Sequence, residues 1–373
     1  MALDITRFAA ALAVAFGHLT GEAFSTGWQY HLGLALDGVA IFFVLSGFVI
    51  RLVTTARPAR ARDYAIDRAS RIYSVVLPAI AFTFLVVLVI HTVPPIRQLP
   101  EDLRGPVSVK GIGTQVATNL TFTAEAWGLD IPVSFNNVFW SLSYECTYYA
   151  IYGIAFFGRG KWRLISLVAL CAVMGPPILS MLPLWLLGCW IHDLYQRLRD
   201  KPDRGILLVT GAVVALGAIG VIARMFLRGS GPALHRAALA FTGPMHVEAR
   251  KLDLHLLQRA SLHFYVVGVP AAVVILIILL ALERISLART NSVVRITRSI
   301  ADGTFSLYLL HLPLLVLAAA YLPYDHSSSW QKLAVLAAVV VLCILAELRI
   351  NRLKNWIRKA AAISPAAVRK VVS

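Results

Sequence analysis

Arg7 and His18 lie eleven residues apart in an apolar stretch near the start of the chain, LDITRFAAALAVAFGHL. Eleven residues are close to three turns of an α-helix, so both side chains would project from one face, about 16 Å apart along the axis. Ionisable groups at membrane depth are costly and normally face a bundle interior or a wet cavity. The pair therefore predicts a buried functional site. The alternative is an arginine that reaches the lipid headgroups and a histidine bonded to a neighbouring helix.

A carboxylate enters a second apolar stretch, NNVFWSLSYECTYYAIYG, at Glu145. A carboxylate in such surroundings needs a cation, a proton of its own or hydrogen bonds, and Arg7 and His18 are the candidate partners. The same stretch adds polar and aromatic candidates for the site: Trp140, Ser141, Ser143 and Tyr144.

Two arginines, Arg68 and Arg71, precede a third apolar stretch and are followed by Tyr73. Three residues apart on a helix, they share one face, and arginine forks match phosphate oxygens. Tyr73 could stack on a ligand or form a hydrogen bond to it. The cluster predicts a nucleotide-phosphate site, and the alternative is a positive anchor at the cytoplasmic boundary.

Further polar or small residues interrupt other apolar runs. Ser46 and Gly47 are small enough to let a neighbouring helix approach closely, and Ser46 could also form a hydrogen bond inside the bundle. His311 precedes Pro313, and Glu347 lies near the end of the last apolar run. A buried histidine of this kind is more often a packing residue than a catalyst.

The composition indicates a polytopic, all-α membrane protein, because 58% of the 373 residues are hydrophobic and only 14% are charged. The four cysteines lie in apolar stretches without paired spacing, so neither disulfides nor a metal site is expected: Cys146, Cys171, Cys189 and Cys343. The net charge of +16 needs no nucleic-acid partner, because the membrane topology accounts for most of it.

We expect a bundle of about ten transmembrane helices in residues 1–350 and a short basic cytoplasmic tail in 351–373. The Gly175-Pro176-Pro177 triplet predicts a break, and 224–262 is expected to include an amphipathic helix on the membrane surface. Basic residues are concentrated on one side, which predicts that both termini are cytoplasmic. The expected spans are 5–21, 34–52, 72–92, 138–157, 163–181, 183–195, 205–223, 263–283, 303–322 and 331–350.

Together these residues resemble acyltransferase family 3, a family of integral-membrane acyltransferases, many of which modify bacterial polysaccharides. The resemblance covers positions 3 to about 347 and follows the family's order through LDITR…H, FFVLSGF (42–48), RASRIY (68–73), WSLSYE (140–145) and SLYLLHLP (306–313). Four positions depart from the usual pattern and bear on donor or acceptor selectivity: Ala40, Ser74, Cys146 and Arg349.

The resemblance implies transfer of an acyl group, most often acetyl, from cytoplasmic acyl-CoA to a hydroxyl of a carbohydrate or glycoconjugate in a bacterial inner membrane. His18 would be the general base, with Arg7 and Glu145 completing the catalytic set. Arg7 would orient the donor or stabilise the oxyanion, and Arg68 and Arg71 would hold the coenzyme A phosphates. Direct transfer and an acyl-His18 relay both stay open.

The donor would be acetyl-CoA, the surrounding partner the membrane lipids, and no metal is expected. The alternative function is a transporter or flippase for a lipid-linked sugar or small molecule, with the buried charges forming a coupling path. A third interpretation is a membrane scaffold without activity, which the presence of both Arg7 and His18 disfavours. The sequence does not identify the acceptor.

Overall fold

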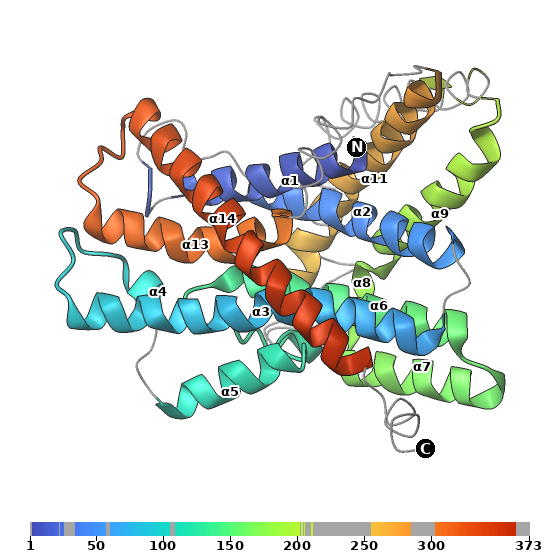
Figure 1. Cartoon of the computed structure of the whole chain (residues 1–373), viewed down its shortest axis with the longest axis horizontal. Helices are drawn as coiled ribbons and strands as arrows, with labels where there is room; N and C mark the ends of the chain where they lie inside the picture. The colour runs from blue at the N-terminus through green and yellow to red at the C-terminus, as the bar shows by residue number, and fades with distance from the viewer. Residues whose placement is uncertain are drawn as a thin grey trace, which may run out of the picture.

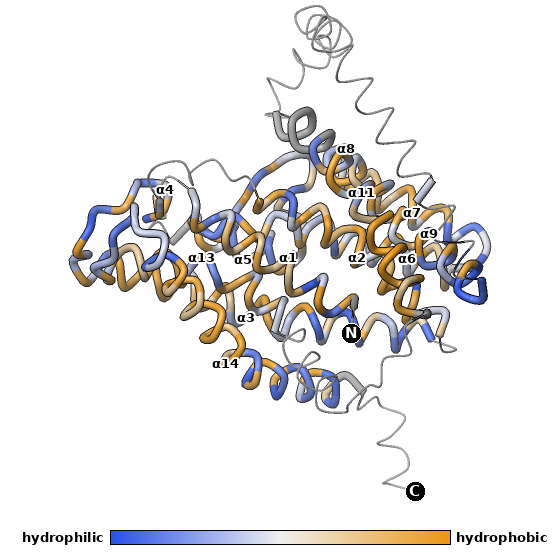
Figure 2. Tube along the Cα trace, turned by 90° about the horizontal axis from the view of Figure 1, so that it is seen from above, coloured by the Kyte–Doolittle hydropathy of each residue, from blue (hydrophilic) through white to orange (hydrophobic). Residues whose placement is uncertain are grey.

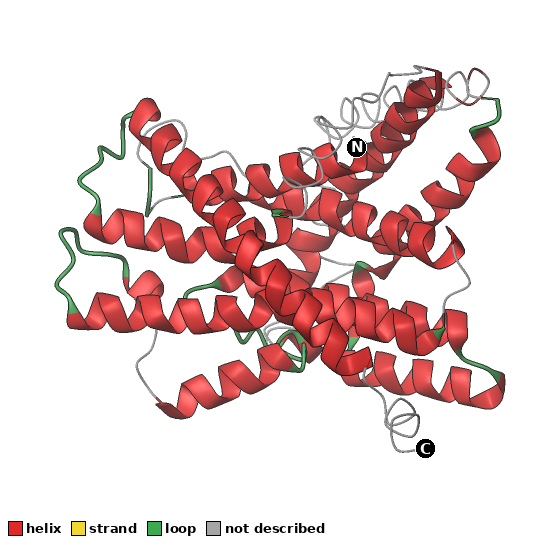
Figure 3. Ribbon diagram, in the orientation of Figure 1, coloured by secondary structure: helices red, strands yellow, loops and turns green. Residues whose placement is uncertain are grey.

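The structure is a computed structural model. It describes residues 2–21, 23–25, 34–56, 60–104, 109–201, 203, 205, 210–211, 255–284 and 303–362. These residues form helices joined by loops, without a named strand among them (Figure 3). The long helices are α1 (Ala2–Leu19), α2 (Leu34–Ala56), α3 (Ala61–Thr92), α6 (Trp140–Phe157), α7 (Gly160–Met174), α9 (Leu182–Leu198), α11 (His255–Arg284), α13 (Thr304–Tyr321) and α14 (Ser329–Ala362). The shorter helices are α4 (Glu101–Arg104), α5 (Val109–Leu120) and α8 (Pro176–Ser180).

The helices form a bundle in which α1, α2, α3, α6 and α13 run roughly parallel or antiparallel, and α14 crosses over α13 and α3 (Figure 1). Apolar residues cover most of each helix, whereas hydrophilic residues gather at the two ends of the bundle and along the last turns of α14 (Figure 2). Many large apolar side chains point outward, for example Leu85, Leu88 and Val168. This outward apolar surface is expected of helices that face lipid.

Within the described residues, six helical segments are long and apolar enough to cross a membrane: Leu34–Ala56, Ala61–Thr92, Pro176–Leu198, His263–Leu282, Thr304–Tyr321 and Ser329–Ala360. The helical membrane bundle is thereby confirmed, while ten crossings and cytoplasmic termini stay predictions. Most of the expected span 205–223 and residues 224–254 of the expected surface helix lie outside the described residues. Helix α14 continues past position 350, so the first part of the expected tail extends the last helix.

The expected span 163–181 is not one helix, because the predicted break occurs at Gly175. Gly175 has a φ of 80°, a left-handed conformation that favours glycine, and Pro176 then opens α8. The indole of Trp127 occupies the space beside Gly175, and its Nε1 donates a hydrogen bond to the carbonyl of Ala172 at 2.9 Å. Helix α7 therefore ends against the loop that precedes α6.

Helices α2 and α9 pack backbone against backbone at a pair of glycines. A Cβ added to Gly47 would lie 1.9 Å from the carbonyl oxygen of Trp185, and one added to Gly188 would lie 2.0 Å from that of Val44. The prediction that Ser46-Gly47 admits a neighbouring helix is confirmed, and the neighbour is α9. Further along both helices, Arg51 of α2 forms an ion pair with Asp193 of α9 at 2.8 Å, so the two helices run parallel.

The loop between α5 and α6 enters the bundle. Asn136 is fully buried, and its amide donates hydrogen bonds to Thr83 Oγ1 at 3.0 Å and to the carbonyl of Leu309 at 3.1 Å. These contacts join the loop to α3 and α13, and they set the depth at which α6 begins. Helix α6 thereby presents its first turns, with Ser141 and Glu145, to the centre of the bundle.

Candidate functional site

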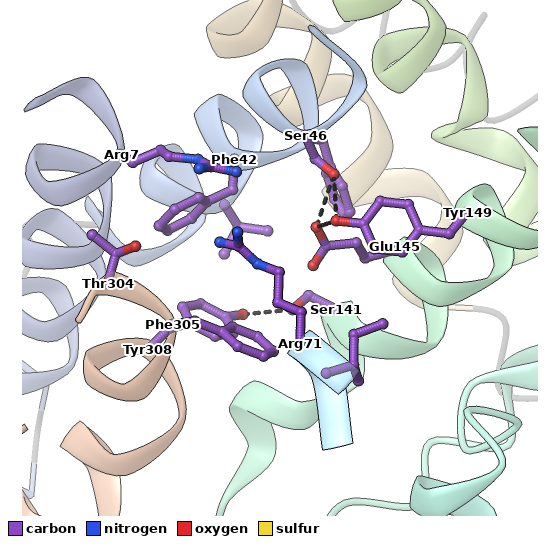
Figure 4. Close-up of a pocket in the computed structure, with 13 residues that line it drawn as sticks. Arg7, Phe42, Ser46, Arg71, Ser141, Glu145, Tyr149, Thr304, Phe305 and Tyr308 are labelled. Atoms are coloured by element: carbon purple, nitrogen blue, oxygen red, sulfur yellow. Dashed lines mark hydrogen bonds between the residues drawn. The ribbon is translucent and has the colours of Figure 1, made fainter. Parts of the chain in front are cut away.

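A cavity of about 60 Å³ lies between α1, α2, α3, α6 and α13 (Figure 4). A volume of this size holds a few water molecules or one small charged group. Its polar lining consists of Arg7, Ser46, Arg71, Ser141, Glu145, Tyr149, Thr304 and Tyr308. Its apolar lining consists of Val39, Phe42, Phe43, Ile72 and Phe305.

Two guanidinium groups enter this cavity from different helices. Arg7 reaches it from α1 and Arg71 from α3, and both side chains extend toward the middle of the cavity (Figure 4). Among the described residues, neither arginine forms an ion pair within 4 Å or a hydrogen bond. Guanidinium groups without a carboxylate partner leave the cavity positively charged, and their planar forks suit a bound phosphate or carboxylate.

Glu145 lines the same cavity but is held by hydroxyl groups. Ser46 Oγ donates a hydrogen bond to Glu145 Oε1 at 2.8 Å, and the Tyr149 hydroxyl donates to the same oxygen. Trp185 Nε1 donates in turn to Ser46 Oγ at 3.2 Å, which connects the network to α9. Neither Arg7 nor His18, the partners expected from the sequence, forms an ion pair with Glu145 among the described residues.

The arginine cluster of α3 is only partly brought into the cavity. Arg71 lines it, whereas the guanidinium carbon of Arg68 lies over the ring of Tyr149, 5.8 Å from its centre. Tyr73 points elsewhere: its hydroxyl donates to the carbonyl of Leu120 at 2.8 Å, and its ring packs on Phe122. The Tyr73 hydroxyl is therefore engaged with the protein backbone, and a contact of Tyr73 with a donor stays a prediction.

His18 meets a second histidine, His311 of α13. His311 Nε2 lies 3.2 Å from His18 Nδ1, and the ring centres are 5.0 Å apart with the planes tilted by 51°. Each Nδ1 also lies near the carbonyl four residues earlier in its own helix, Val14 at 3.0 Å for His18 and Leu307 at 2.9 Å for His311. His311 is completely buried.

The cavity and the histidine pair are separate but joined by aromatic rings. Helix α1 is continuous from Ala2 to Leu19, so Arg7 and His18 keep the predicted rise of about 16 Å. Phe42 and Tyr308 share the cavity wall with ring centres 5.7 Å apart, and the Tyr308 ring lies 6.4 Å from that of His311. The molecule thus holds a cationic cavity and a histidine pair at different depths.

The remaining candidates lie around the cavity. Trp140 packs edge-on against Tyr144 and Phe43, and Ser143 is buried. Ser141 lines the cavity and shares a hydrogen bond with the Tyr308 hydroxyl at 2.6 Å.

Sequence reasoning missed three of the groups around this site. Tyr149 follows Glu145 by four residues, so it shares a helix face with that carboxylate, and this spacing could have revealed it. Trp185 and Tyr308 belong to other helices, and nothing in their local sequence indicates the contact. Arg71 also faces a second, smaller cavity with Glu347 and Lys354 of α14.

Comparison with known proteins identifies the class. The family model described as an acyltransferase domain, that of acyltransferase family 3, matches residues 2–348. The chain therefore belongs to this family, as its motifs predict, and is a multi-pass integral-membrane acyltransferase. A similar curated protein is Nodulation protein 10 of Rhizobium leguminosarum bv. viciae, which is 24% identical over 280 residues, covering 72% of this chain and 68% of the relative. No solved structure matches the chain.

Proposed function

We propose that this acyltransferase moves an acetyl group from cytoplasmic acetyl-CoA to a hydroxyl of a carbohydrate or glycoconjugate. The observation that carries the proposal is the cavity in which Arg7 and Arg71 meet without a carboxylate partner among the described residues. Coenzyme A bears several phosphates, and arginine is well suited to bind them. Family membership supplies the reaction class, and the cavity supports an anionic donor.

The donor's phosphates would bind at Arg71 and Arg7, with Arg68 adding positive charge beside Tyr149. Because the cavity is small, it would hold a phosphate or part of the pantetheine arm, while the adenine nucleotide stays outside it. The arm would then carry the thioester deeper into the bundle toward His18. Glu145, held by Ser46 and Tyr149, would offset part of the positive charge of the two arginines in the cavity.

His18 would act as the general base. A hydroxyl is a weak nucleophile at neutral pH, and a neutral imidazole is suited to take its proton during attack on a thioester. An oxyanion donor must lie about 3 Å from the reacting carbonyl oxygen. Since Arg7 starts about 16 Å from His18 along α1 and its side chain ends in the cavity, its position supports a role in holding the donor.

The acceptor would approach from the side of the membrane opposite to the donor, in a bacterial inner membrane. The concentration of basic residues on one side of the predicted topology supports this orientation. Under it, Arg71 faces the cytosolic acyl-CoA pool and His18 lies nearer the outer face. The acetyl group would then reach the acceptor without coenzyme A crossing the membrane.

Membranes containing the protein and its native glycoconjugates, supplied with radiolabelled acetyl-CoA, provide the test. We expect thiol release together with label in a carbohydrate fraction, removable by mild alkali as an ester. His18→Ala should lower the rate by about 10²- to 10⁴-fold, as loss of a general base does. His91→Ala is the matched control, because His91 makes the same bond to the carbonyl four residues earlier, at 2.8 Å, near the end of α3.

Two results would refute the proposal. One is the absence of both thiol release and ester-linked label when wild-type protein is present in the membrane. The other is a His18→Ala variant that inserts normally and keeps the wild-type rate, which would remove His18 as the base.

A further inference from the structure

The proton positions in the histidine pair follow from their carbonyl neighbours. A backbone carbonyl accepts hydrogen bonds and never donates them. Val14 therefore requires a proton on His18 Nδ1, and Leu307 requires one on His311 Nδ1. In a neutral imidazole only one nitrogen carries a proton, so both Nε2 atoms carry lone pairs.

The contact between the rings is then directional. The lone pair of His311 Nε2 faces the N–H group of His18 Nδ1, and the two nitrogens are 3.2 Å apart. The Nδ1 proton of His18 is shared between His311 Nε2 and the Val14 carbonyl. A fully buried nitrogen such as His311 Nε2 needs a hydrogen-bond partner, and His18 provides it.

We propose that His311 is a positioning residue for the transfer: it accepts the Nδ1 proton of His18, fixes that ring in one tautomer and leaves the His18 Nε2 lone pair free to take the acceptor's proton. This inference rests on the proposed function, in which His18 is the base. It assigns to His311 an orienting role of the kind that a carboxylate has in a Ser-His-Asp triad. Here the orienting group is a neutral imidazole.

The proton balance is closed within the pair and the substrates. As the acceptor oxygen bonds to the thioester carbonyl carbon, its O–H bond breaks and the proton goes to His18 Nε2. The imidazolium so formed donates a stronger hydrogen bond from Nδ1 to His311, because one partner is now charged. When the C–S bond breaks, the Nε2 proton passes to the departing thiolate, and His18 returns to its starting tautomer.

A packing role alone would not require this arrangement. His91 shows that a helical histidine can satisfy its Nδ1 on the carbonyl four residues earlier, without a hydrogen bond to a second ring among the described residues. His18 makes that same bond and adds His311. The second contact strengthens when His18 becomes charged, so it favours the transition state over the resting enzyme.

Kinetics of two His311 variants test the role. His311→Leu removes the acceptor and should lower kcat about 10- to 150-fold with little change in the KM for acetyl-CoA, the range expected for a hydrogen bond to a charged group. His311→Gln should recover part of the loss, because its amide oxygen can accept the same proton. The control is His192→Leu, which removes another buried histidine, on α9, and should leave kcat within about twofold.

A spectroscopic measurement on the wild-type protein is independent of activity. Nitrogen-15 NMR of histidine-labelled protein in lipid nanodiscs should show a His18 ring with a protonated Nδ1 and a bare Nε2, assigned by its loss in His18→Ala. A protonated Nε2 with a bare Nδ1 would overturn the inference even if His311→Leu failed to insert.

The kinetic outcomes separate the inference from the function on which it rests. An unchanged kcat in His311→Leu, alongside an inactive His18→Ala, would reject the role of His311 and keep His18 as the base. An active His18→Ala would reject both. A His311→Gln variant no better than His311→Leu would reject hydrogen-bond acceptance as the basis of the effect.

Discussion

Replacing Arg71 by Gln should weaken donor binding much more than the same change at Arg68, one turn earlier in α3. Arg71 lines the cavity and has no ion pair or hydrogen bond among the described residues, so its guanidinium is available to a phosphate. A hydrogen bond to a charged group contributes about 1.5–3 kcal/mol, which corresponds to about a 10- to 150-fold rise in KM. The saturated rate should change little, because this binding is lost equally from ground and transition states.

Arg68 provides the matched control. Its guanidinium lies 5.8 Å from the centre of the Tyr149 ring and outside the cavity lining. From there Arg68 would act on the donor only as a solvent-screened charge, which contributes about 0.2–1 kcal/mol, so Arg68→Gln should raise the KM for acetyl-CoA no more than about fivefold. Arg71→Lys should recover part of the loss, since it restores the charge without the bidentate fork.

The assay compares two donors, acetyl-CoA and S-acetylpantetheine, which lacks phosphates. With acetyl-CoA, wild type and Arg71→Gln should differ by the full factor. With S-acetylpantetheine they should converge, because the group that Arg71 binds is missing. Equal losses with both donors, or a wild-type KM for acetyl-CoA in a correctly inserted Arg71→Gln, would refute phosphate binding at this position.

Three further predictions concern the scaffold. Gly47→Ala places a Cβ 1.9 Å from an α9 carbonyl oxygen, so α2 and α9 must separate by about 1 Å. The variant should lose about 1–3 kcal/mol of folding stability and unfold at a lower temperature in detergent. Gly113→Ala is the control and should keep the wild-type melting temperature, because nothing lies within 4 Å of its added Cβ. Burial raises the pKa of Glu125 from 4.5 to about 8, so ionisation of this carboxyl opposes folding as the pH rises through that window. Glu125→Gln should therefore be more stable than wild type by about 3 kcal/mol at pH 7, and the difference in melting temperature should grow from about pH 5 to pH 8. A difference that does not change with pH would refute this reasoning. In a cysteine-free background, a cysteine at position 62 should resist an impermeant thiol reagent in outer-membrane-permeabilised cells, whereas a cysteine at position 98 should react. The reverse pattern would show that the predicted topology is inverted.

Local features of the chain were predicted well. The break at Gly175 follows from two prolines and a glycine whose conformations are nearly independent of tertiary structure. The spacing of Arg7 and His18 follows from helix geometry alone. The close approach at Gly47 was also predicted, because small residues in an apolar helix have few other uses.

Partner identities could not be predicted, because they depend on which helices meet. Glu145 pairs with Ser46 and Tyr149 although Arg7 and His18 are the more obvious charges. His311 lies 293 positions from His18 in the chain, so no periodicity connects them. Tyr73 is different: two residues after Arg71, it is rotated by about 200° on a helix, and this geometry already places it on the opposite face.

The rigidity of α1 constrains how the two parts of the site can cooperate. A continuous helix keeps the Arg7 end and the His18 end about 16 Å apart, so neither residue can approach the other's ligand without the helix unwinding. The reacting thioester must therefore cover this distance through the donor's own length. Changes in the cationic cavity should then act on donor KM, and changes at His18 and His311 on kcat. This division of effects follows from one helix and would be lost if the acyl group reacted inside the cavity.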